Sequence, residues 1–254
     1  MRSLPHLNRT ALRWTLLAIG LYLLFLALRL PAGVILPRLP LPSALHYAHA
    51  SGSLWSGTLH DVRIRQLGLG QLHWSFTPWT LFTGSLGADL RLEGRRGRLR
   101  GWLGYGLGGT LEARGIRGRV NLASLDGLTR PLVLDGTLHL ESLAARFEPG
   151  SRLTLAGQAE WRPALIGGVQ DLSLGRVRLE AAERANGSRI RIRNQGGDLA
   201  LDGHLDLDAA GTWRLDLTLQ NRNANRKDLQ QILRFLGRPD SAGRYRLQRT
   251  GRIW

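Results

Sequence analysis

The sequence predicts an all-β domain, in the form of a curled antiparallel sheet, a trough or a sandwich, with one N-terminal transmembrane helix and a short C-terminal helix. Beyond residue 51, apolar and polar side chains alternate with a period of two over most of the chain. This alternation is typical of antiparallel strands with one dry face and one wet face. Before residue 31, in contrast, a long apolar run shows no alternation, which indicates a membrane-spanning helix.

The N-terminal run is long enough to cross a lipid bilayer. The stretch WTLLAIGLYLLFLAL, which begins at Trp14, has no charged residue, and a helix over residues 12–30 would span roughly 28 Å, close to the hydrocarbon thickness of a membrane. Because Arg2, Arg9 and Arg13 precede it, the positive-inside rule places the N-terminus in the cytoplasm and the rest of the chain across the membrane. The expected anchor residues are Trp14, Leu16, Leu17, Tyr22, Leu23, Leu24, Phe25 and Leu26.

A cleaved signal peptide is the alternative interpretation of this run. A small-x-small pattern occurs at Ala48–Ala50, but it lies roughly 20 residues beyond the apolar run, which is too far for cleavage. We therefore expect an uncleaved anchor followed by a stiff, Pro-rich spacer, LPRLPLPS at 36–43. The expected organisation is a cytoplasmic N-terminus (1–11), a transmembrane helix (12–30), a Pro-rich linker (31–50) and a periplasmic β domain (51–254).

Short strands separated by tight turns account for most of the remaining chain. The 32 glycines and 10 prolines suit many tight turns better than disorder. Turn chemistry occurs at Asn186-Gly187, Gly196-Gly197 and Asp126-Gly127. A slip of parity at Gly175 indicates a bulge, and the pair Asp135-Gly136, inside an alternating run, indicates a bulge or a bend. The clearest strand faces are Val62 with Ile64, Leu90 with Leu92, Leu153 with Leu155, Ile190 with Ile192, and Trp213 with Leu215 and Leu217.

One helix is predicted near the C-terminus, over residues 226–236. Its apolar residues recur at i, i+3, i+4 and i+7 from Leu229, which is one stripe of an α-helix. Asn225 is a suitable N-cap, and Gly237 with Pro239 ends the helix. Such a helix could cover an open end or edge of the sheet, and strands around Tyr245–Leu247 and Ile253–Trp254 are expected to follow it.

The positive charge comes almost entirely from arginine. The net charge is +16, and since Lys227 is the only lysine among 35 Lys and Arg residues, 34 are arginines. These arginines are spread through the chain and mostly alternate with Leu, Ile or Val, whereas a nucleic-acid groove needs clustered basic residues with interleaved aromatic ones. We therefore expect solvated strand faces and no nucleic-acid partner. Attraction to anionic lipid headgroups is compatible with the charge.

No constellation of residues predicts catalysis, a metal or a cofactor. Cys is absent, which excludes thiol nucleophiles and Cys-based zinc sites. His46 and His49 form the only close His pair, without a carboxylate nearby or a third ligand. The Gly-rich GYGLGG at 104–109 lacks the Lys-Ser/Thr ending and the following helix of a phosphate-binding loop. We expect a protein that is not an enzyme.

Three short motifs occur in a fixed order along the chain: SGSLWSG at 51–57, then a strand with Trp before Pro and Leu-x-x-Gly, and finally Leu-Gly-x-Pro…Gly-x-Tyr-x-Leu near the C-terminus. The first two, which supply the candidate interface residues, comprise Gly52, Leu54, Trp55, Gly57, Trp74, Pro78, Leu81 and Gly84. The third comprises Leu236, Gly237, Pro239, Gly243, Tyr245, Leu247 and Gly251. In this order the motifs resemble those of the type II secretion system protein N family.

The resemblance implies a single-pass protein of the bacterial inner membrane that contributes to the export of folded proteins from the periplasm. The implied partners are other secretion subunits, either the inner-membrane platform or the periplasmic domains of the secretin. It also implies kinship with AsmA-like β domains, whose strands curl into a trough with a dry interior. Within such a domain, Trp55 and Trp74 are expected to fill the anchor-proximal end of the core, in preference to contacting a partner.

Two functions stay open at this level. The first is an assembly subunit without enzymatic activity or cofactor, which contacts its partners by strand addition at an unpaired sheet edge or through its arginine-rich face. The alternative is an AsmA-like lipid-binding or lipid-transport trough, in which apolar residues shelter an acyl chain and arginines at the rim meet its phosphate.

Overall fold

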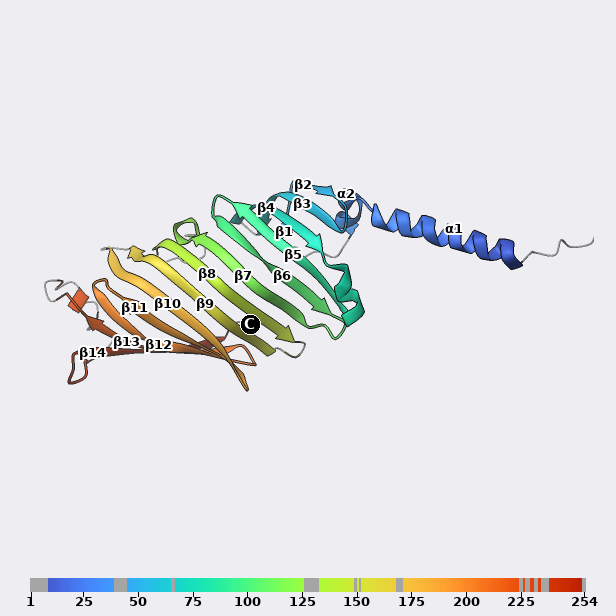
Figure 1. Cartoon of the computed structure of the whole chain (residues 1–254). Coiled ribbons are helices and arrows are strands. Elements are labelled where there is room, and N and C mark those ends of the chain that lie inside the picture. The colour runs from blue at the N-terminus through green and yellow to red at the C-terminus, as the bar shows by residue number, and fades with distance from the viewer. Residues whose placement is uncertain are drawn as a thin grey trace, which may run out of the picture.

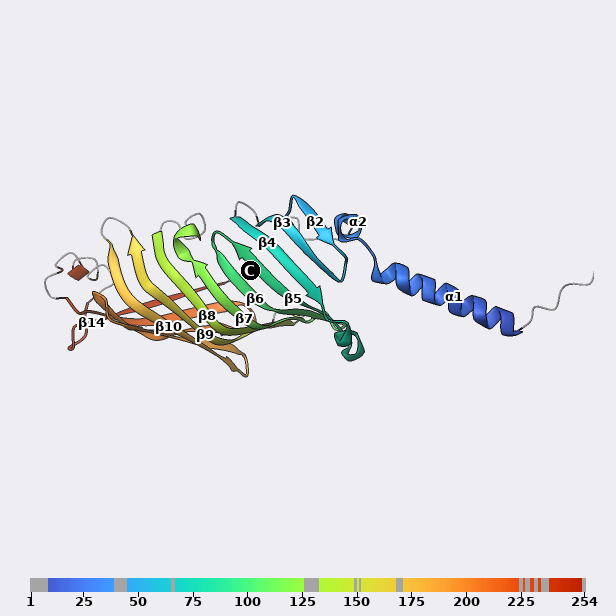
Figure 2. The same ribbon diagram turned by 45° about the horizontal axis from the view of Figure 1, so that its top comes forward.

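The computed structural model describes residues 9–38, 45–64, 67–125, 133–148, 150, 152–167, 171–223, 226, 229–230, 233 and 238–252. These residues form one large sheet with a long helix at one end (Figures 1 and 2). The helical elements are α1 (Arg9–Leu28), α2 (Ala32–Ile35), η1 (Leu36–Arg38), η2 (Pro78–Thr83) and η3 (Leu122–Leu125). The strands are β1 (Leu45–His46), β2 (His49–Gly52), β3 (Ser56–Ile64), β4 (Leu67–Phe76), β5 (Ser85–Gly94), β6 (Gly97–Gly106), β7 (Leu111–Asn121), β8 (Val133–Glu148), β9 (Arg152–Gly167), β10 (Leu172–Arg184), β11 (Gly187–Gln195), β12 (Leu199–Asp208), β13 (Thr212–Asn221) and β14 (Arg244–Arg252).

The strands pair in almost the same order as they occur in the chain. The order across the sheet is β1-β3-β4-β5-β6-β7-β8-β9-β10-β11-β12-β13-β14, with β2 also paired to β3, and every pairing is antiparallel. Since β1 and β14 are at opposite ends of this order, the sheet is open, and both views show it twisted and curled. The predicted antiparallel β architecture is confirmed, as one curled sheet in place of a two-sheet sandwich.

Several glycines lie in turns and at bulges, as the sequence predicts. Asn186-Gly187 closes the hairpin between β10 and β11, where Arg184 pairs with Gly187. At Gly175 the register between β9 and β10 shifts and the backbone has φ +71°, and a second shift occurs beside Gly136, at φ +107°. Such φ values are open to glycine and strained for other residues. The pair Asp126-Gly127 lies outside the described residues.

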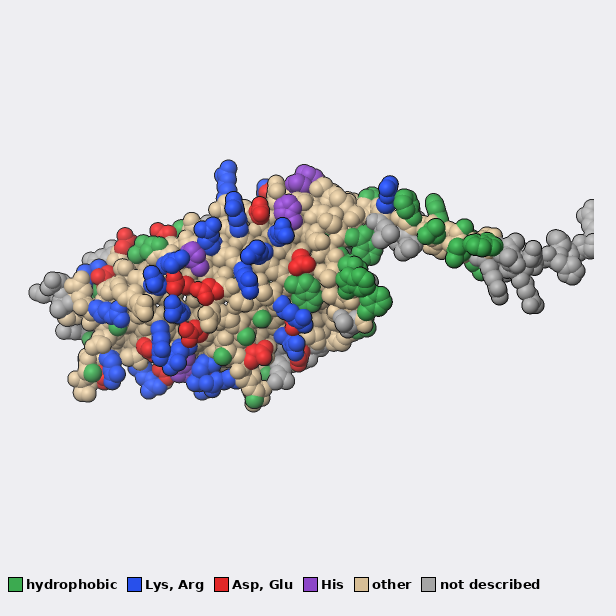
Figure 3. All heavy atoms as spheres, in the orientation of Figure 1, with side chains coloured by type: hydrophobic (Ala, Val, Ile, Leu, Met, Phe, Trp, Pro, Cys, Tyr) green, Lys and Arg blue, Asp and Glu red, His purple; other side chains and the backbone are tan. Residues whose placement is uncertain are grey.

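The two faces of the sheet differ in chemistry. On the face shown in Figure 3, arginines and carboxylates are spread over the strands, and we call it the arginine face. The opposite face, the apolar face, contains most of the buried side chains. Its main cluster is formed by Ala164, Leu174, Val177, Leu199, Leu219, Leu229 and Leu233, with Trp161, Ile166, Leu172, Leu179, Ile192, Leu201, Tyr245 and Leu247 packed against it.

The segment predicted as a C-terminal helix covers this cluster. Leu229, Gln230 and Leu233 are helical, and the two leucines are each only 3% exposed. Burial of these leucines against strands β9–β14 follows from the single apolar stripe of the segment. The other positions of 227–236, and the strand expected at Ile253–Trp254, lie outside the described residues.

Helix α1 covers 20 residues and extends away from the β1–β3 end of the sheet (Figure 1). Within the part of the chain that the structure describes, no helix meets the length and hydropathy needed to span a membrane. The transmembrane role of residues 12–30 therefore stays a prediction.

The sheet is joined to α1 without a free spacer in the described part of 31–50. Pro31 forms an isolated antiparallel bridge with Ser53, and the N–H of Leu54 donates a 2.8 Å hydrogen bond to the carbonyl of Leu30. Ala32, in α2, is completely buried. The segment expected as a linker thus contains α2, η1, β1 and the first half of β2, and residues 39–44 within it lie outside the description.

Candidate functional site

The SGSLWSG motif forms the joint between α1 and the sheet. Gly52 ends β2 with φ +92°, and a Cβ there would lie 2.6 Å from the carbonyl oxygen of Ser56. Leu54 is bonded to Leu30, as described above, and the carbonyl of Trp55 accepts a 2.6 Å hydrogen bond from the N–H of Phe76. The rings of Trp55 and Phe76 lie 5.0 Å apart in a tilted arrangement. The motif therefore connects α1 to the end of β4.

The second motif begins at this joint. The indole of Trp74 donates a 3.0 Å hydrogen bond to the carbonyl of Leu54. Its ring lies over Gly57, its register partner, since a Cβ on Gly57 would lie 2.5 Å from Cζ2 of Trp74. Both Trp55 and Trp74 are half-buried, and their hydrogen bonds place them at the end of the sheet that is joined to α1.

The remaining motif residues belong to the turn between β4 and β5. Pro78 and Leu81 lie in η2, and Gly84 follows it with φ +70°. The side chain of Leu81 lies outside the description. A contact of these residues with a partner remains a proposal.

The expected anchor residues are solvent-exposed wherever their side chains are described, as in Trp14, Leu16, Leu17, Tyr22 and Phe25. The side chains of Leu23, Leu24 and Leu26 lie outside the description. At the end of α1 the guanidinium of Arg29 lies over the ring of Phe25, 4.7 Å from its centroid.

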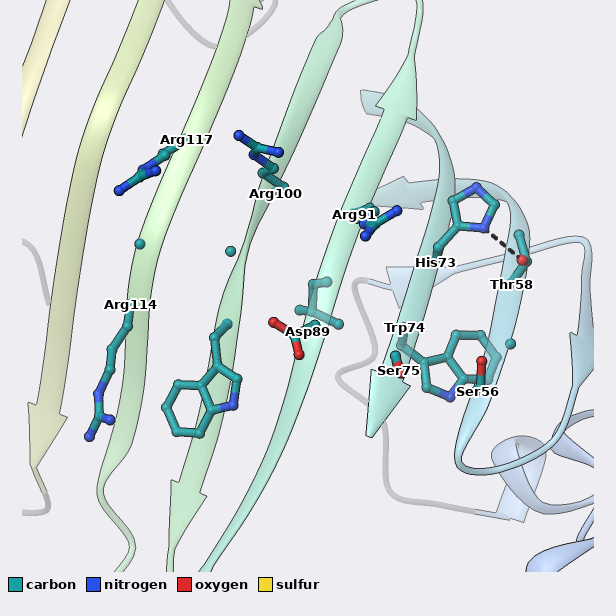
Figure 4. A pocket seen from close by; sticks show the side chains of 15 residues that line it. Ser56, Thr58, His73, Trp74, Ser75, Asp89, Arg91, Arg100, Arg114 and Arg117 are labelled. Carbon is teal, nitrogen blue, oxygen red and sulfur yellow. Dashed lines mark hydrogen bonds between the residues drawn. The ribbon is translucent and has the colours of Figure 1, made fainter. Parts of the chain in front are cut away.

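A row of arginines crosses β5–β7 on the arginine face. Arg91 pairs in register with Arg100, which pairs with Arg117, and His73 of β4 precedes them in the same row. Figure 4 shows the three guanidinium groups on neighbouring strands, with His73 hydrogen-bonded to Thr58. We call Arg91, Arg100 and Arg117 the arginine row.

The arginine row has no ion-pair partner among the described residues. Its members border an open hollow of about 790 Å³ that also contains Asp89, whose carboxylate accepts a 3.4 Å hydrogen bond from Thr77. Like charges that face each other across strands destabilise a sheet, so the row does not serve the stability of the fold. Its charge is available to an anionic ligand or an acidic surface.

The C-terminal half of the same face is different, because most of its arginines pair with carboxylates there. Glu160, which is 7% exposed, lies within 3.0–3.6 Å of guanidinium nitrogens of Arg162, Arg176 and Arg178. Further pairs join Arg189 to Asp206, Arg193 to Asp202, Arg244 to Asp240, and Arg246 to Asp216. The two halves of the arginine face therefore differ in how far their arginines are paired with carboxylates.

An aromatic ring flanks the arginine row. Trp102 of β6 lies flat over Gly87 and Gly104, where a Cβ would collide with its indole. The guanidinium of Arg114 covers the ring at 4.8 Å from its centroid, and Arg114 also pairs with Glu112. The hydrogen bond from Arg114 lowers the pKa of the Glu112 carboxyl. A stacked Trp–Arg pair beside free arginines is suited to polar, acidic groups.

The apolar face contains a separate groove over the first strands. It has a volume of about 250 Å³ and lies on β1 and β3–β7, away from the cluster covered by Leu229 and Leu233. Its apolar lining is Leu45, Val62, Ile64, Leu69, Leu72, Leu90, Leu92, Leu99, Leu103, Ala113 and Ile116. Within the described residues, no group of three or more His, Cys, Asp or Glu side chains is placed to hold a metal ion.

Sequence reasoning missed the arginine row. Alternation places Arg91 on the other face of its strand from Leu90 and Leu92. It does not show that Arg100 and Arg117, on the next two strands, lie beside Arg91. The register of the hairpins decides this, and the bulge between Arg100 and Trp102 shifts it by one residue.

Comparison with known proteins agrees with the family resemblance. The family model described as "Type II secretion system (T2SS), protein N" matches residues 43–248. A protein named Type II secretion system protein N from Aeromonas hydrophila is 29% identical over 248 residues, which cover 91% of this chain and 94% of the relative. The protein of the same name from Vibrio cholerae is 26% identical over 252 residues, which cover 93% and 99%. No solved structure matches the chain.

Proposed function

Because the chain belongs to the type II secretion system protein N family, we propose that it is a non-enzymatic subunit of that system which binds an acidic segment of another subunit through its arginine row. The observation that carries this proposal is the absence of ion-pair partners for Arg91, Arg100 and Arg117 among the described residues, beside a half-sheet in which most arginines are paired. A partner carboxylate would relieve the repulsion within the row.

In this proposal α1 anchors the subunit in the bacterial inner membrane, with the N-terminus in the cytoplasm and the sheet in the periplasm. The support is the uncharged sequence of residues 14–28 and the exposure of its described apolar side chains. The partner would belong to the inner-membrane platform or to the periplasmic domains of the secretin.

A charge-neutralised variant tests the function. We expect the combined substitutions Arg91→Gln, Arg100→Gln and Arg117→Gln to leave the protein folded while its secretion substrate accumulates in the periplasm. The matched control replaces Arg191, Arg214 and Arg249, exposed arginines of β11, β13 and β14, with Gln. It removes the same charge outside the row, so export should continue. Normal export by the first variant would overturn the proposal.

Cross-linking identifies the partner directly. The chain has no Cys, so a single Cys at Ser75, which lines the hollow, gives one reactive position. We expect an adduct with another secretion subunit from Ser75→Cys and none from Thr250→Cys, an exposed position on β14. Loss of the adduct in the charge-neutralised variant would connect it to the arginine row.

Lipid binding is the second candidate, and the groove on the apolar face favours it. This groove is lined almost wholly by aliphatic carbon, as an acyl-chain site would be. Native mass spectrometry of the detergent-extracted protein should then show a copurified lipid, and Leu72→Trp should displace it by filling the groove. A protein without bound lipid under mild extraction would remove this candidate.

A further inference from the structure

The outermost residues at one end of strands β3–β7 carry no charge, and the first charged residues further along the strands are Asp89 and Glu112. The start of β3, the end of β4, the start of β5, the end of β6 and the start of β7 meet there, as the pairings of Phe76 with Ala88, Ser85 with Gly106, and Tyr105 with Leu111 show. The three segments at this end, residues 51–59, 74–88 and 103–111, contain no Asp, Glu, Lys or Arg. In a chain with 21% charged residues, their meeting at one place defines what we call the uncharged end.

The uncharged end exposes large apolar side chains. Trp79 and Phe82 of η2 are 75% and 84% exposed and stack with ring centroids 6.0 Å apart. Leu107, in the turn after β6, is 89% exposed, and its N–H bonds to the carbonyl of Gly84 at 3.0 Å, which joins it to η2. Leu86 and Tyr105, each 52% exposed, continue the surface. Water is an unfavourable environment for such a contiguous surface.

This end is also the one that is joined to α1. Leu30, two residues beyond α1, accepts a hydrogen bond from Leu54, and the next residue, Trp55, accepts one from Phe76. Phe76 ends β4 and lies two residues before η2. In Figures 1 and 2 the short η2 helix lies on the α1 side of the sheet, and in Figure 3 exposed hydrophobic side chains gather there.

The chemistry of the surface fits a lipid bilayer. Trp and Phe are favoured at the membrane interface, and a charge placed there in apolar surroundings would be costly. The opposite end of the same strands is rich in charge, with Glu93, Arg95, Arg96, Arg98 and Arg119. The strands are therefore polarised along their length, apolar next to the anchor and charged away from it.

We propose that the uncharged end inserts Trp79, Phe82 and Leu107 into the interface of the membrane that holds α1, so that the sheet is seated on the lipid surface. This inference rests on the proposed anchoring by α1 and adds a second membrane contact to it. Seating would fix the orientation of the arginine row relative to the membrane. The arginine row would then face partners at a set height above the bilayer.

Depth-dependent fluorescence quenching tests the seating in the full-length protein. The Cys-free chain is reconstituted into phosphatidylcholine vesicles, with and without spin-labelled phosphatidylcholine, after labelling of a single Cys with the environment-sensitive dye NBD. The positions are Phe82→Cys at the uncharged end, Arg95→Cys in the turn at the opposite end of the β5–β6 hairpin, and Leu17→Cys within α1. We expect quenching at 82 to exceed quenching at 95 by at least threefold.

Labels at the three positions distinguish contact of the uncharged end with lipid from insertion of α1 into the membrane. Quenching at 17 and 82 but not at 95 supports the seating. Quenching at 17 alone overturns the seating and leaves the anchor in place, whereas quenching at 82 without 17 supports a lipid contact and contradicts the anchor. An unquenched but blue-shifted label at 82 would indicate a protein contact at that position and would overturn the proposal.

Discussion

The indole of Trp74 donates a hydrogen bond to the backbone carbonyl of Leu54 across the joint between helix and sheet. Since Leu54 itself bonds to Leu30, one tryptophan on β4 fixes the position of the segment that leaves α1. The bulk of Trp74 lies over a glycine, where no other residue leaves room for the ring. Residues of the first two sequence motifs therefore together form the joint between α1 and the sheet.

We expect Trp74→Phe to reduce stability by about 1 kcal/mol, the usual worth of one hydrogen bond, because the ring stays over Gly57 while the donor is lost. Trp74→Ala should cost about 3–5 kcal/mol, since the ring is lost as well. Urea unfolding of the full chain in detergent, followed by tryptophan fluorescence and circular dichroism, measures both. An unchanged stability of Trp74→Phe would contradict a role for the hydrogen bond, and equal losses for the two variants would contradict a role for the ring.

Gly57→Ala should destabilise the protein clearly, although it adds only one methyl group. Its Cβ would collide with the carbonyl of Ser51 as well as with the Trp74 ring, so neither neighbour can simply turn away. We expect a loss of about 1–3 kcal/mol, typical of overpacking. Gly68→Ala on β4 is the control, since no heavy atom lies within 4 Å of a Cβ placed there.

Leu233→Ala tests the packing of the C-terminal helical segment on the sheet. Its side chain is 3% exposed in the main apolar cluster, so we expect a loss of about 2–4 kcal/mol. Leu107→Ala, at an 89% exposed position, should change the free energy of unfolding by less than about 0.5 kcal/mol. Similar small effects at both sites would show that the segment does not pack as described.

Glu160→Gln removes the carboxylate that lies among Arg162, Arg176 and Arg178. Because Glu160 is buried, the three guanidinium groups would lose a shared counterion and repel one another. We expect a loss of about 2–4 kcal/mol. The control is Glu180→Gln on β10, an exposed carboxylate, and thermal unfolding of both variants at neutral pH makes the comparison.

The ionisation of Asp216 should make the stability of the folded protein depend on pH. Hydrogen bonds from Arg246 and Gln248, with a weaker contribution from His204, lower the pKa of its carboxyl to about 2. A lowered folded-state pKa stabilises the protein above the unfolded-state value of about 3.9, and this stability is lost as the pH falls through the folded value. The melting temperature of wild type should exceed that of Asp216→Asn at pH 7, and the difference should shrink between about pH 4 and pH 2. A difference that is constant over this range would show that the carboxylate is not held by these groups.

The sequence predicts the local structure well and the long-range placement poorly. Alternation around Leu90 and Leu92 indicates a strand with two unlike faces, and the periodicity from Leu229 indicates the helical segment, because both patterns reflect burial of neighbouring residues. The bridge from Pro31 to Ser53 joins residues that are far apart in the chain, so a Pro-rich stretch appears from sequence as a free linker. The arginine row depends in the same way on hairpin register.

The family was recognisable because its motifs lie where the backbone is most constrained. Gly52 and Gly57 have no room for a side chain at the joint, and Gly84 has φ +70° beside Leu107. The arginine row has no such constraint, since exposed side chains leave the backbone free. Binding residues of this kind are visible only once the strands are placed side by side.

The near-sequential pairing of the strands has a consequence for how the protein is made. From β3 to β13, each new strand finds its hydrogen-bonding partner in the strand synthesised just before it, so no early segment has to wait for a distant one. Such local pairing keeps the entropy of loop closure small at each step. The strands can therefore pair one after another, in the order of their synthesis, from the end that carries α1. Only the packing of Leu229 and Leu233 on the sheet and the pairing of β14 have to follow at the end.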